Sequence, residues 1–313
     1  MKPILCLLCL FVMLCLTACG NGDDQPSQPQ GGADTGKTSD AGAKVSDAKT
    51  PGPPQVVWEL DQDLSGPESA YVDVTTGTIF VSNVAGSPAE KDGQGWITKL
   101  DLEGNVITAK WVDGLNAPKG MRAAAGILWV SDINELIGIT IATGEIAHRV
   151  TIDEAKFLND VAAAPDGTVY ISDSAGVRIY QYKDGNVALF TDDAELGRPN
   201  GLLVEGDRLI VGAAGQLLAY DRQTKERTQL AAADATGATN LDGIEADGRG
   251  GYIVSDWPGG KVMHVNSKGD VRTILQLGRG TADLAYLPDK HLLILPRMVD
   301  NKVTAYDLSK TVE

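Results

Sequence analysis

The sequence repeats itself with a period of about forty residues, which is typical of propellers and other repeat arrays. Five four-residue motifs mark this period, and their second residues lie 40, 41, 42 and 40 positions apart. They are Pro118-Lys119-Gly120-Met121, Leu158-Asn159-Asp160-Val161, Pro199-Asn200-Gly201-Leu202, Leu241-Asp242-Gly243-Ile244 and Thr281-Ala282-Asp283-Leu284. A sixth motif, Pro67-Glu68-Ser69-Ala70, begins the first and longest unit.

Each unit has the pattern of four short strands. A more apolar run follows each motif, and turn signals such as Pro165-Asp166-Gly167 separate the two, which predicts a hairpin. Two further strands follow, for example over 177–182 and 186–190. No unit shows a 3.6-residue apolar period, which excludes an α-solenoid. The chain is therefore predicted to be all-β, with residues 55–313 forming a six-bladed β-propeller.

The last unit lacks its fourth strand. It ends after a third strand over 302–308, whereas an additional strand over 55–60 precedes the first unit. We expect this N-terminal strand to complete the sixth blade and close the ring, which removes open strand edges. A closed propeller of this kind is expected to be a monomer.

The N-terminus has the pattern of a bacterial export signal. A short positive end is followed by an apolar run over 4–16, which is too short to span a bilayer stably. The run ends in a sequence that resembles a lipobox, Leu16-Thr17-Ala18-Cys19-Gly20. We therefore expect a signal peptide over 1–18, a lipid on Cys19 and a flexible, Gly- and Asp-rich tether over 19–54. The alternative is an ordinary signal peptide that happens to contain a cysteine.

Composition narrows the location and the partners. All four cysteines lie within residues 1–19, so the mature chain has no disulfide and no thiolate nucleophile. The formal charge of −15 argues against nucleic acid and against electrostatic binding to anionic lipids, which leaves the lipid anchor as the only membrane contact. Gly20 follows the cysteine where an inner-membrane retention signal would be Asp. We expect the protein on the periplasmic face of the outer membrane.

The second residues of the six motifs should meet at the centre of the ring, because the innermost strand of each blade begins at the central channel. These residues are Glu68, Lys119, Asn159, Asn200, Asp242 and Ala282. Four of the six are oxygen donors, and the set contains no sulfur or imidazole. Such a set favours a hard divalent cation, with Ca²⁺ expected and Mg²⁺ or Mn²⁺ as alternatives.

These motifs resemble the six-bladed propeller family of senescence marker protein (regucalcin), gluconolactonase and luciferin-regenerating enzyme. The resemblance covers about residues 55–310 and depends on the motifs that contain Glu68, Asn159, Asn200 and Asp242. It implies that Glu68, Asn200 and Asp242 bind the cation and that Asp242 is also the general base. It implies that Asn159 is a further ligand or a substrate contact.

The substrate is not implied by this resemblance. Lactonases of the family carry an arginine two residues before the first Asn, where this sequence has Phe157. Lys119 at the channel position could instead hold a carboxylate or an oxyanion. Two interpretations remain open: a metal-dependent hydrolase of a small lactone or ester, and a non-catalytic propeller that binds an envelope protein or a glycan.

Other polar residues of the sequence have a structural interpretation. Three second strands end in Ser-Asp, and we expect Asp132, Asp173 and Asp256 to hydrogen-bond blade turns. The three histidines have no position in the repeat, and none falls at the channel, which counts against propeller lyases that use a channel histidine.

Overall fold

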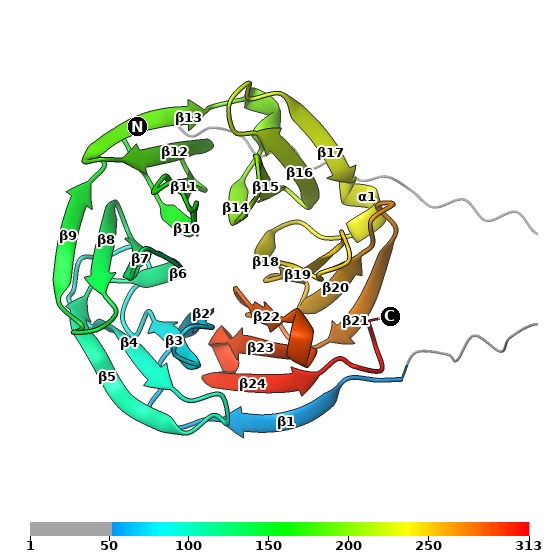
Figure 1. The fold of residues 1–313 in the computed structure, drawn as a ribbon, viewed down its shortest axis with the longest axis horizontal. Coiled ribbons are helices and arrows are strands. Elements are labelled where there is room, and N and C mark those ends of the chain that lie inside the picture. Colours follow the sequence, from blue (N-terminus) through cyan, green and yellow to red (C-terminus); the bar gives the residue numbers. More distant parts are fainter. Residues whose placement is uncertain (1–51, 313) are drawn as a thin grey trace, which may run out of the picture. The chain divides into compact units, whose positions relative to one another are not determined.

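The computed structural model describes residues 52–312, which form six four-stranded antiparallel sheets arranged in a ring. In Figure 1 the strands nearest the centre are β2 (Pro67–Asp73), β6 (Pro118–Ala124), β10 (Leu158–Ala163), β14 (Pro199–Glu205), β18 (Leu241–Ala246) and β22 (Ala285–Leu287). The predicted six-bladed β-propeller is therefore confirmed. Within the described residues the helical elements are short: α1 (Ala233–Thr236) and the 3-10 turns η1 (Ala194–Leu196), η2 (Pro288–Lys290) and η3 (Met298–Asp300).

Five blades use consecutive strands, ordered from the centre outward. Blade one contains β2 (Pro67–Asp73), β3 (Thr78–Asn83), β4 (Gly95–Leu100) and β5 (Val106–Leu115). Blade two contains β6 (Pro118–Ala124), β7 (Ile127–Asp132), β8 (Glu135–Thr140) and β9 (Ile146–Thr151). Blade three contains β10 (Leu158–Ala163), β11 (Val169–Asp173), β12 (Arg178–Lys183) and β13 (Asn186–Thr191). Blade four contains β14 (Pro199–Glu205), β15 (Arg208–Ala213), β16 (Gln216–Asp221) and β17 (Arg227–Ala231), and blade five contains β18 (Leu241–Ala246), β19 (Tyr252–Asp256), β20 (Lys261–Val265) and β21 (Val271–Gln276).

Blade six joins the two ends of the described chain, as predicted. It contains β22 (Ala285–Leu287), β23 (Leu292–Arg297) and β24 (Lys302–Asp307), and β1 (Gln55–Leu60) is its outer strand. β1 pairs antiparallel with β24 over its whole length, from Gln55 opposite Asp307 to Leu60 opposite Val303. Figure 1 shows the first and last strands side by side. The ring is therefore closed by strands about 245 residues apart in the sequence.

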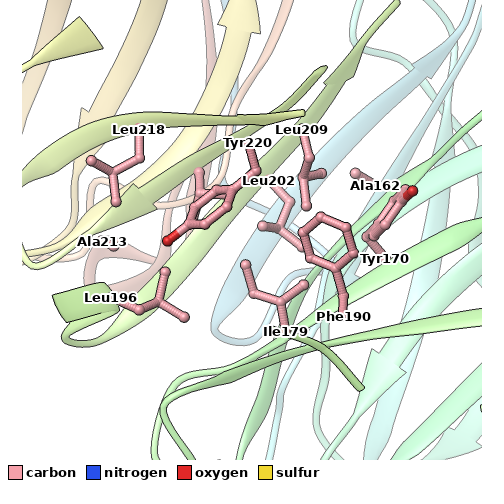
Figure 2. Packing of buried hydrophobic residues seen from close by; sticks show 11 residues of the cluster. Ala162, Tyr170, Ile179, Phe190, Leu196, Leu202, Leu209, Ala213, Leu218 and Tyr220 are labelled. Carbon is pink, nitrogen blue, oxygen red and sulfur yellow. The ribbon is translucent and has the colours of Figure 1, made fainter. Parts of the chain in front are cut away.

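The core is divided among the interfaces between blades. Each of the six interfaces has its own cluster of buried apolar side chains, contributed by both neighbouring sheets. Figure 2 shows the cluster between blades three and four, where Phe190 lies between the rings of Tyr170 and Tyr220. The strands read as apolar on both faces because each sheet is covered by a neighbour on each side.

A bulge recurs at the inner end of five blades. In β2, β6, β10, β14 and β18 one extra residue interrupts the pairing at the second or third position of the strand. A bulge bends the strand and redirects its side chains. The serines of the second strands stabilise it, because Ser82, Ser172 and Ser255 each accept a hydrogen bond from the bulged backbone amide, at 2.7–2.9 Å.

Glycine lets the bulged strands approach one another closely. A Cβ atom on Gly201 would lie 1.9 Å from the carbonyl oxygen of Asp242 in the next blade, and one on Gly243 would lie 2.4 Å from the amide nitrogen of Leu284. No side chain fits at such distances from backbone atoms. The third motif residue is therefore small wherever neighbouring inner strands are closest.

The expected signal peptide and Cys19 lie outside the described residues, as does the expected tether up to residue 51. Gly52, the first described residue, donates its amide to the carbonyl of Lys310 at 2.8 Å. Among residues 52–312 no helix is long and apolar enough to cross a membrane.

Removing β1 should destabilise the ring. A chain that begins at residue 61 loses the pairing with β24 and the packing of Trp58 and Leu60 against the interface of blades six and one. We expect its free energy of unfolding to fall by about 3 kcal/mol or more relative to a chain that begins at residue 52. Urea unfolding followed by tryptophan fluorescence measures the difference, and equal midpoints for the two chains would contradict the role of β1.

Candidate functional site

A cavity opens at the end of the channel where the inner strands begin. It has a volume of about 480 Å³. Five of the six predicted channel residues line it: Glu68, Lys119, Asn159, Asn200 and Asp242. These residues come from five different blades, so the ring brings together what the sequence separates. The sixth, Ala282, is fully buried and is not part of the lining.

Glu68 and Asp242 are two carboxylates in a buried floor. Their exposed fractions are 6% and 2%. Burial, together with the nearby carboxylates of Asp242 and Asp283, raises the pKa of Glu68 well above its usual range, and Lys119 opposes this effect. Burial and the carboxylate of Asp283 likewise raise the pKa of Asp242, whereas the Asn200 amide lowers it. The floor therefore resists two negative charges unless a positive charge joins them.

Hydrogen bonds orient the side-chain amides of Asn200 and Asn159 so that their oxygen atoms are free. The Asn200 amide nitrogen donates to the Asp242 carboxylate and, at 3.3 Å, to the side-chain oxygen of Asn240. The Asn159 amide nitrogen donates to the hydroxyl of Ser174 at 3.2 Å. Because each nitrogen is engaged with an acceptor, each side-chain oxygen is the atom left for another partner.

Three buried oxygens on this floor have no hydrogen-bond partner. They are Oε2 of Glu68, Oδ1 of Asn200 and Oδ2 of Asp242, one from each of the three residues implied as metal ligands. Buried polar atoms are nearly always partnered in folded proteins, so three such atoms on residues that line one cavity fit a bound cation. Two carboxylate oxygens and an amide oxygen suit a hard divalent cation. Within residues 52–312 no three His, Cys, Asp or Glu side chains form a metal-binding group, so the candidate set depends on the asparagines.

Among the residues that line the cavity, Lys119 carries the one positively charged side chain on the floor. Its ammonium donates to the carbonyl of Ala117 at 2.9 Å and lies 4.5 Å from the ring centre of Phe157. Burial lowers the pKa of Lys119, and the negative charges of Glu68 and Asp132 oppose this effect. Phe157 therefore forms a cation–π contact with Lys119.

A second polar layer lies beneath the floor, and sequence reasoning missed it. Asp160 and Asp283 are the third residues of their motifs, where three other blades have glycine. The carboxylate of Asp160 accepts from the amides of Val161 and Leu202, both at 2.6 Å. Burial raises the pKa of Asp160 to about 7. Alignment of the six motifs could have identified both residues, since each places a charged side chain at a position where the other motifs have glycine or serine.

Asp283 is less completely satisfied than Asp160. One oxygen accepts from the hydroxyl of Ser69 at 2.5 Å, and Oδ1 has no partner. Burial, followed by the charge of Asp160, raises the pKa of Asp283 well above its usual range. Farther along the channel the guanidinium of Arg122 bonds to Glu245 at 2.6 Å. The positive charge of Arg122 opposes the rise in the pKa of Asp283, whereas the negative charge of Glu245 adds to it.

Two of the three Ser-Asp aspartates, Asp132 and Asp173, hold the connecting loops, as expected, whereas Oδ1 of the third, Asp256, has no hydrogen-bond partner. Asp132 accepts from the amides of Asn116 and Ala117 at 2.9 and 2.7 Å. Asp173 accepts from Lys156, Phe157 and Gly176 at 2.9–3.0 Å. These carboxylates therefore fix the loops that lead into the inner strands, and they act on the cavity only through that geometry.

Solved structures with the same fold include enzymes of two kinds. A gluconolactonase from Xanthomonas campestris is 15% identical, with a TM-score of 0.63, over 82% of this chain and 95% of that chain. Virginiamycin B lyase from Staphylococcus aureus, solved in a catalytically inactive form with quinupristin, is 14% identical, with a TM-score of 0.55, over 81% and 98%. A streptogramin B lyase is 12% identical, with a TM-score of 0.56, over 81% and 96%. Identities this low support the six-bladed fold alone.

The sequence itself matches no protein-family model and no curated protein. The resemblance inferred from the channel motifs is thus accompanied by a shared fold.

Replacing Asp283 by asparagine should stabilise the metal-free protein at neutral pH. The folded state holds the Asp283 proton more tightly than the unfolded state does, so this contribution to stability is lost as pH rises from about 4 toward the folded-state pKa. Asparagine stays neutral and can still accept from Ser69. We expect the Asp283→Asn variant to gain roughly 1 kcal/mol or more over the wild type at about pH 8, and much less at about pH 5.

Urea unfolding in the presence of a chelator measures this difference. The matched control is Asp289→Asn, at an exposed aspartate in η2, which should follow the wild type at every pH. Parallel pH profiles for Asp283→Asn and the wild type would contradict the assignment of a buried, costly charge.

Proposed function

We propose that this propeller is a metal-dependent hydrolase of a lactone or ester. The observation that carries the proposal is the set of three orphan oxygens, on Glu68, Asn200 and Asp242, which face one cavity from three blades. A hydrolase also fits the rest of the lining. Among the described residues no cysteine, serine or histidine lines the cavity, so the chain offers water rather than one of these side chains as the nucleophile.

A divalent cation bound to these oxygens would polarise the carbonyl of the substrate as a Lewis acid. Asp242 acts as the general base: it takes a proton from the attacking water while the oxygen of that water bonds to the carbonyl carbon. Asp242 is suited to this role because it lines the cavity and a hydrogen bond from the Asn200 amide fixes the position of its carboxylate. Cleavage of the carbon–oxygen ester bond releases an alcohol, which receives that proton, and a carboxylic acid.

Asn159 and Lys119 orient the substrate. The Asn159 amide is held by Ser174, so its oxygen can serve as a further ligand or contact a substrate hydroxyl. The Lys119 ammonium has one protein acceptor and lies in the cavity wall, where it can hold a substrate oxyanion. Both residues are nearly fully buried, at 7% and 2% exposure, which limits their movement and keeps the geometry preorganised.

The N-terminal pattern extends the proposal to location. We infer export, cleavage before Cys19 and lipidation of that residue, which would hold the propeller at the periplasmic face of the outer membrane. The support is the apolar run that ends in Leu16-Thr17-Ala18-Cys19-Gly20.

Calcium should stabilise the chelated protein through the floor residues. A cation a hundredfold above its Kd adds about 2.7 kcal/mol to the free energy of unfolding, which corresponds to a rise of a few degrees in Tm. The Asp242→Ala variant should lose both this rise and any hydrolysis of a panel of lactones and aryl esters.

Asp173→Ala is the control for this experiment, because Asp173 braces a loop and does not line the cavity. It should lower the starting Tm and still show the calcium-dependent rise. No cation-dependent shift in the wild type would remove the metal site and the hydrolase proposal with it. A shift without turnover of any substrate would favour the non-catalytic, binding form of the protein.

Lipidation predicts a specific mass for the native protein. Intact mass spectrometry of material purified from membranes should find Cys19 as the first residue, with acyl chains attached. A Cys19→Ala variant should be recovered in the soluble fraction. An unmodified N-terminus at another residue would contradict the anchor.

A further inference from the structure

The mouth of the cavity differs in charge from its floor. Two arginines, Arg198 and Arg279, lie on the lining together with the aromatic rings of Phe157 and Trp257. Arg198 immediately precedes β14, and Arg279 lies in the loop that follows β21. Both loops connect the outer strand of one blade to the centre of the next blade. We call these four residues the rim.

The guanidinium of Arg279 is stacked on an aromatic side chain. Its central carbon lies 4.7 Å from the ring centre of Trp257, within the range of a cation–π contact. Stacking uses the flat face of the guanidinium and leaves the N–H groups along its edge free. Trp257 itself is only half-buried, so part of the indole is open to the cavity.

Neither rim arginine is neutralised by the protein. Seven other arginines form ion pairs with carboxylates, whereas Arg198 and Arg279 form none within residues 52–312. Both are exposed. Arg249 and Arg272 also form no ion pair within these residues, but neither of them lines this cavity.

With a divalent cation bound, the net charge of the site favours an anionic substrate. A divalent cation would neutralise Glu68 and Asp242 on the floor, and the positive charges of Lys119, Arg198 and Arg279 would then remain. A planar, bidentate guanidinium is the side chain best matched to a carboxylate or phosphate. The open indole and Phe157 add flat apolar surface beside these donors.

We propose that the substrate carries an anionic carboxylate or phosphate group joined to a flat apolar body, and that Arg198 and Arg279 bind the anion while Trp257 contacts the apolar part. This inference rests on the proposed hydrolase function for the identity of the reacting bond. Arg198 and Arg279 are thus specificity-determining residues that do not touch the reacting carbonyl.

Binding without turnover tests the rim directly. Isothermal titration of the calcium-loaded protein would use 3-phenylpropanoate and phenyl phosphate as anionic probes and 3-phenylpropanamide as the neutral match. We expect at least one anion to bind about tenfold or more tightly than the amide. Preference for the carboxylate or for the phosphate identifies the anion.

Variants of the rim arginines distinguish anion binding at the rim from calcium binding at the floor. Arg198→Gln and Arg279→Gln should each weaken the preferred anion about tenfold, with no change in calcium affinity or in binding of the amide. The matched control is Arg249→Gln, because Arg249 is an exposed arginine in the turn between β18 and β19, at the opposite end of β18 from Asp242. It should bind the probes as the wild type does.

The outcomes distinguish the two proposals. Unchanged anion binding in both rim variants, or an amide that binds as tightly as the anions, overturns the rim proposal even if esters are hydrolysed. Rim-dependent anion binding without a calcium-dependent rise in Tm overturns the hydrolase proposal and leaves the rim in place. If esters are turned over, the same variants should raise KM for an anionic ester and leave KM for its methyl-capped form unchanged.

Discussion

Closure of the ring is the constraint on which the rest of this structure depends. Two contacts close the ring, and both involve blade six. On the outside β1 pairs with β24, and at the centre the backbone of Asp283 pairs in parallel with Ser69 of blade one. With both contacts every sheet has a neighbour on each side, so all six interfaces can bury apolar side chains. An open array would expose two faces and a strand edge, which is costly in water and invites aggregation.

The closed ring also forces polar groups into the centre. Six inner strands begin around one axis, and the bulges turn the second motif residue toward it. Glycine at Gly201 and Gly243 allows this approach, whereas Asp160 and Asp283 add buried carboxylates to the layer beneath. Concentrating like charges at low exposure is unfavourable for a structural core. It is the arrangement expected of a site that binds a cation.

The cavity divides into two zones with different chemistry. Its floor is built on the starts of inner strands, which are braced by Asp132 and Asp173 and held by neighbouring blades. Its rim is built on loops, where Arg198 and Arg279 are exposed and unpaired within the described part of the chain. Rigid strands suit groups that must hold a cation in fixed geometry, and loops suit groups that select a substrate. This division lets a common fold serve different substrates.

The sequence by itself determined the blade count, the closing strand and the five channel residues that share the cavity, because a forty-residue period assigns the same place to the same position in every unit. Only the tertiary structure decided which atoms are left without partners, since the free oxygen of Asn200 depends on its contact with Asp242, 42 residues away in another blade. The rim was also decided by the tertiary structure. Arg198 directly precedes its motif, in the same repeat position as Phe157, whereas Arg279 lies two residues before its own motif, and only the closed ring brings both to one cavity mouth.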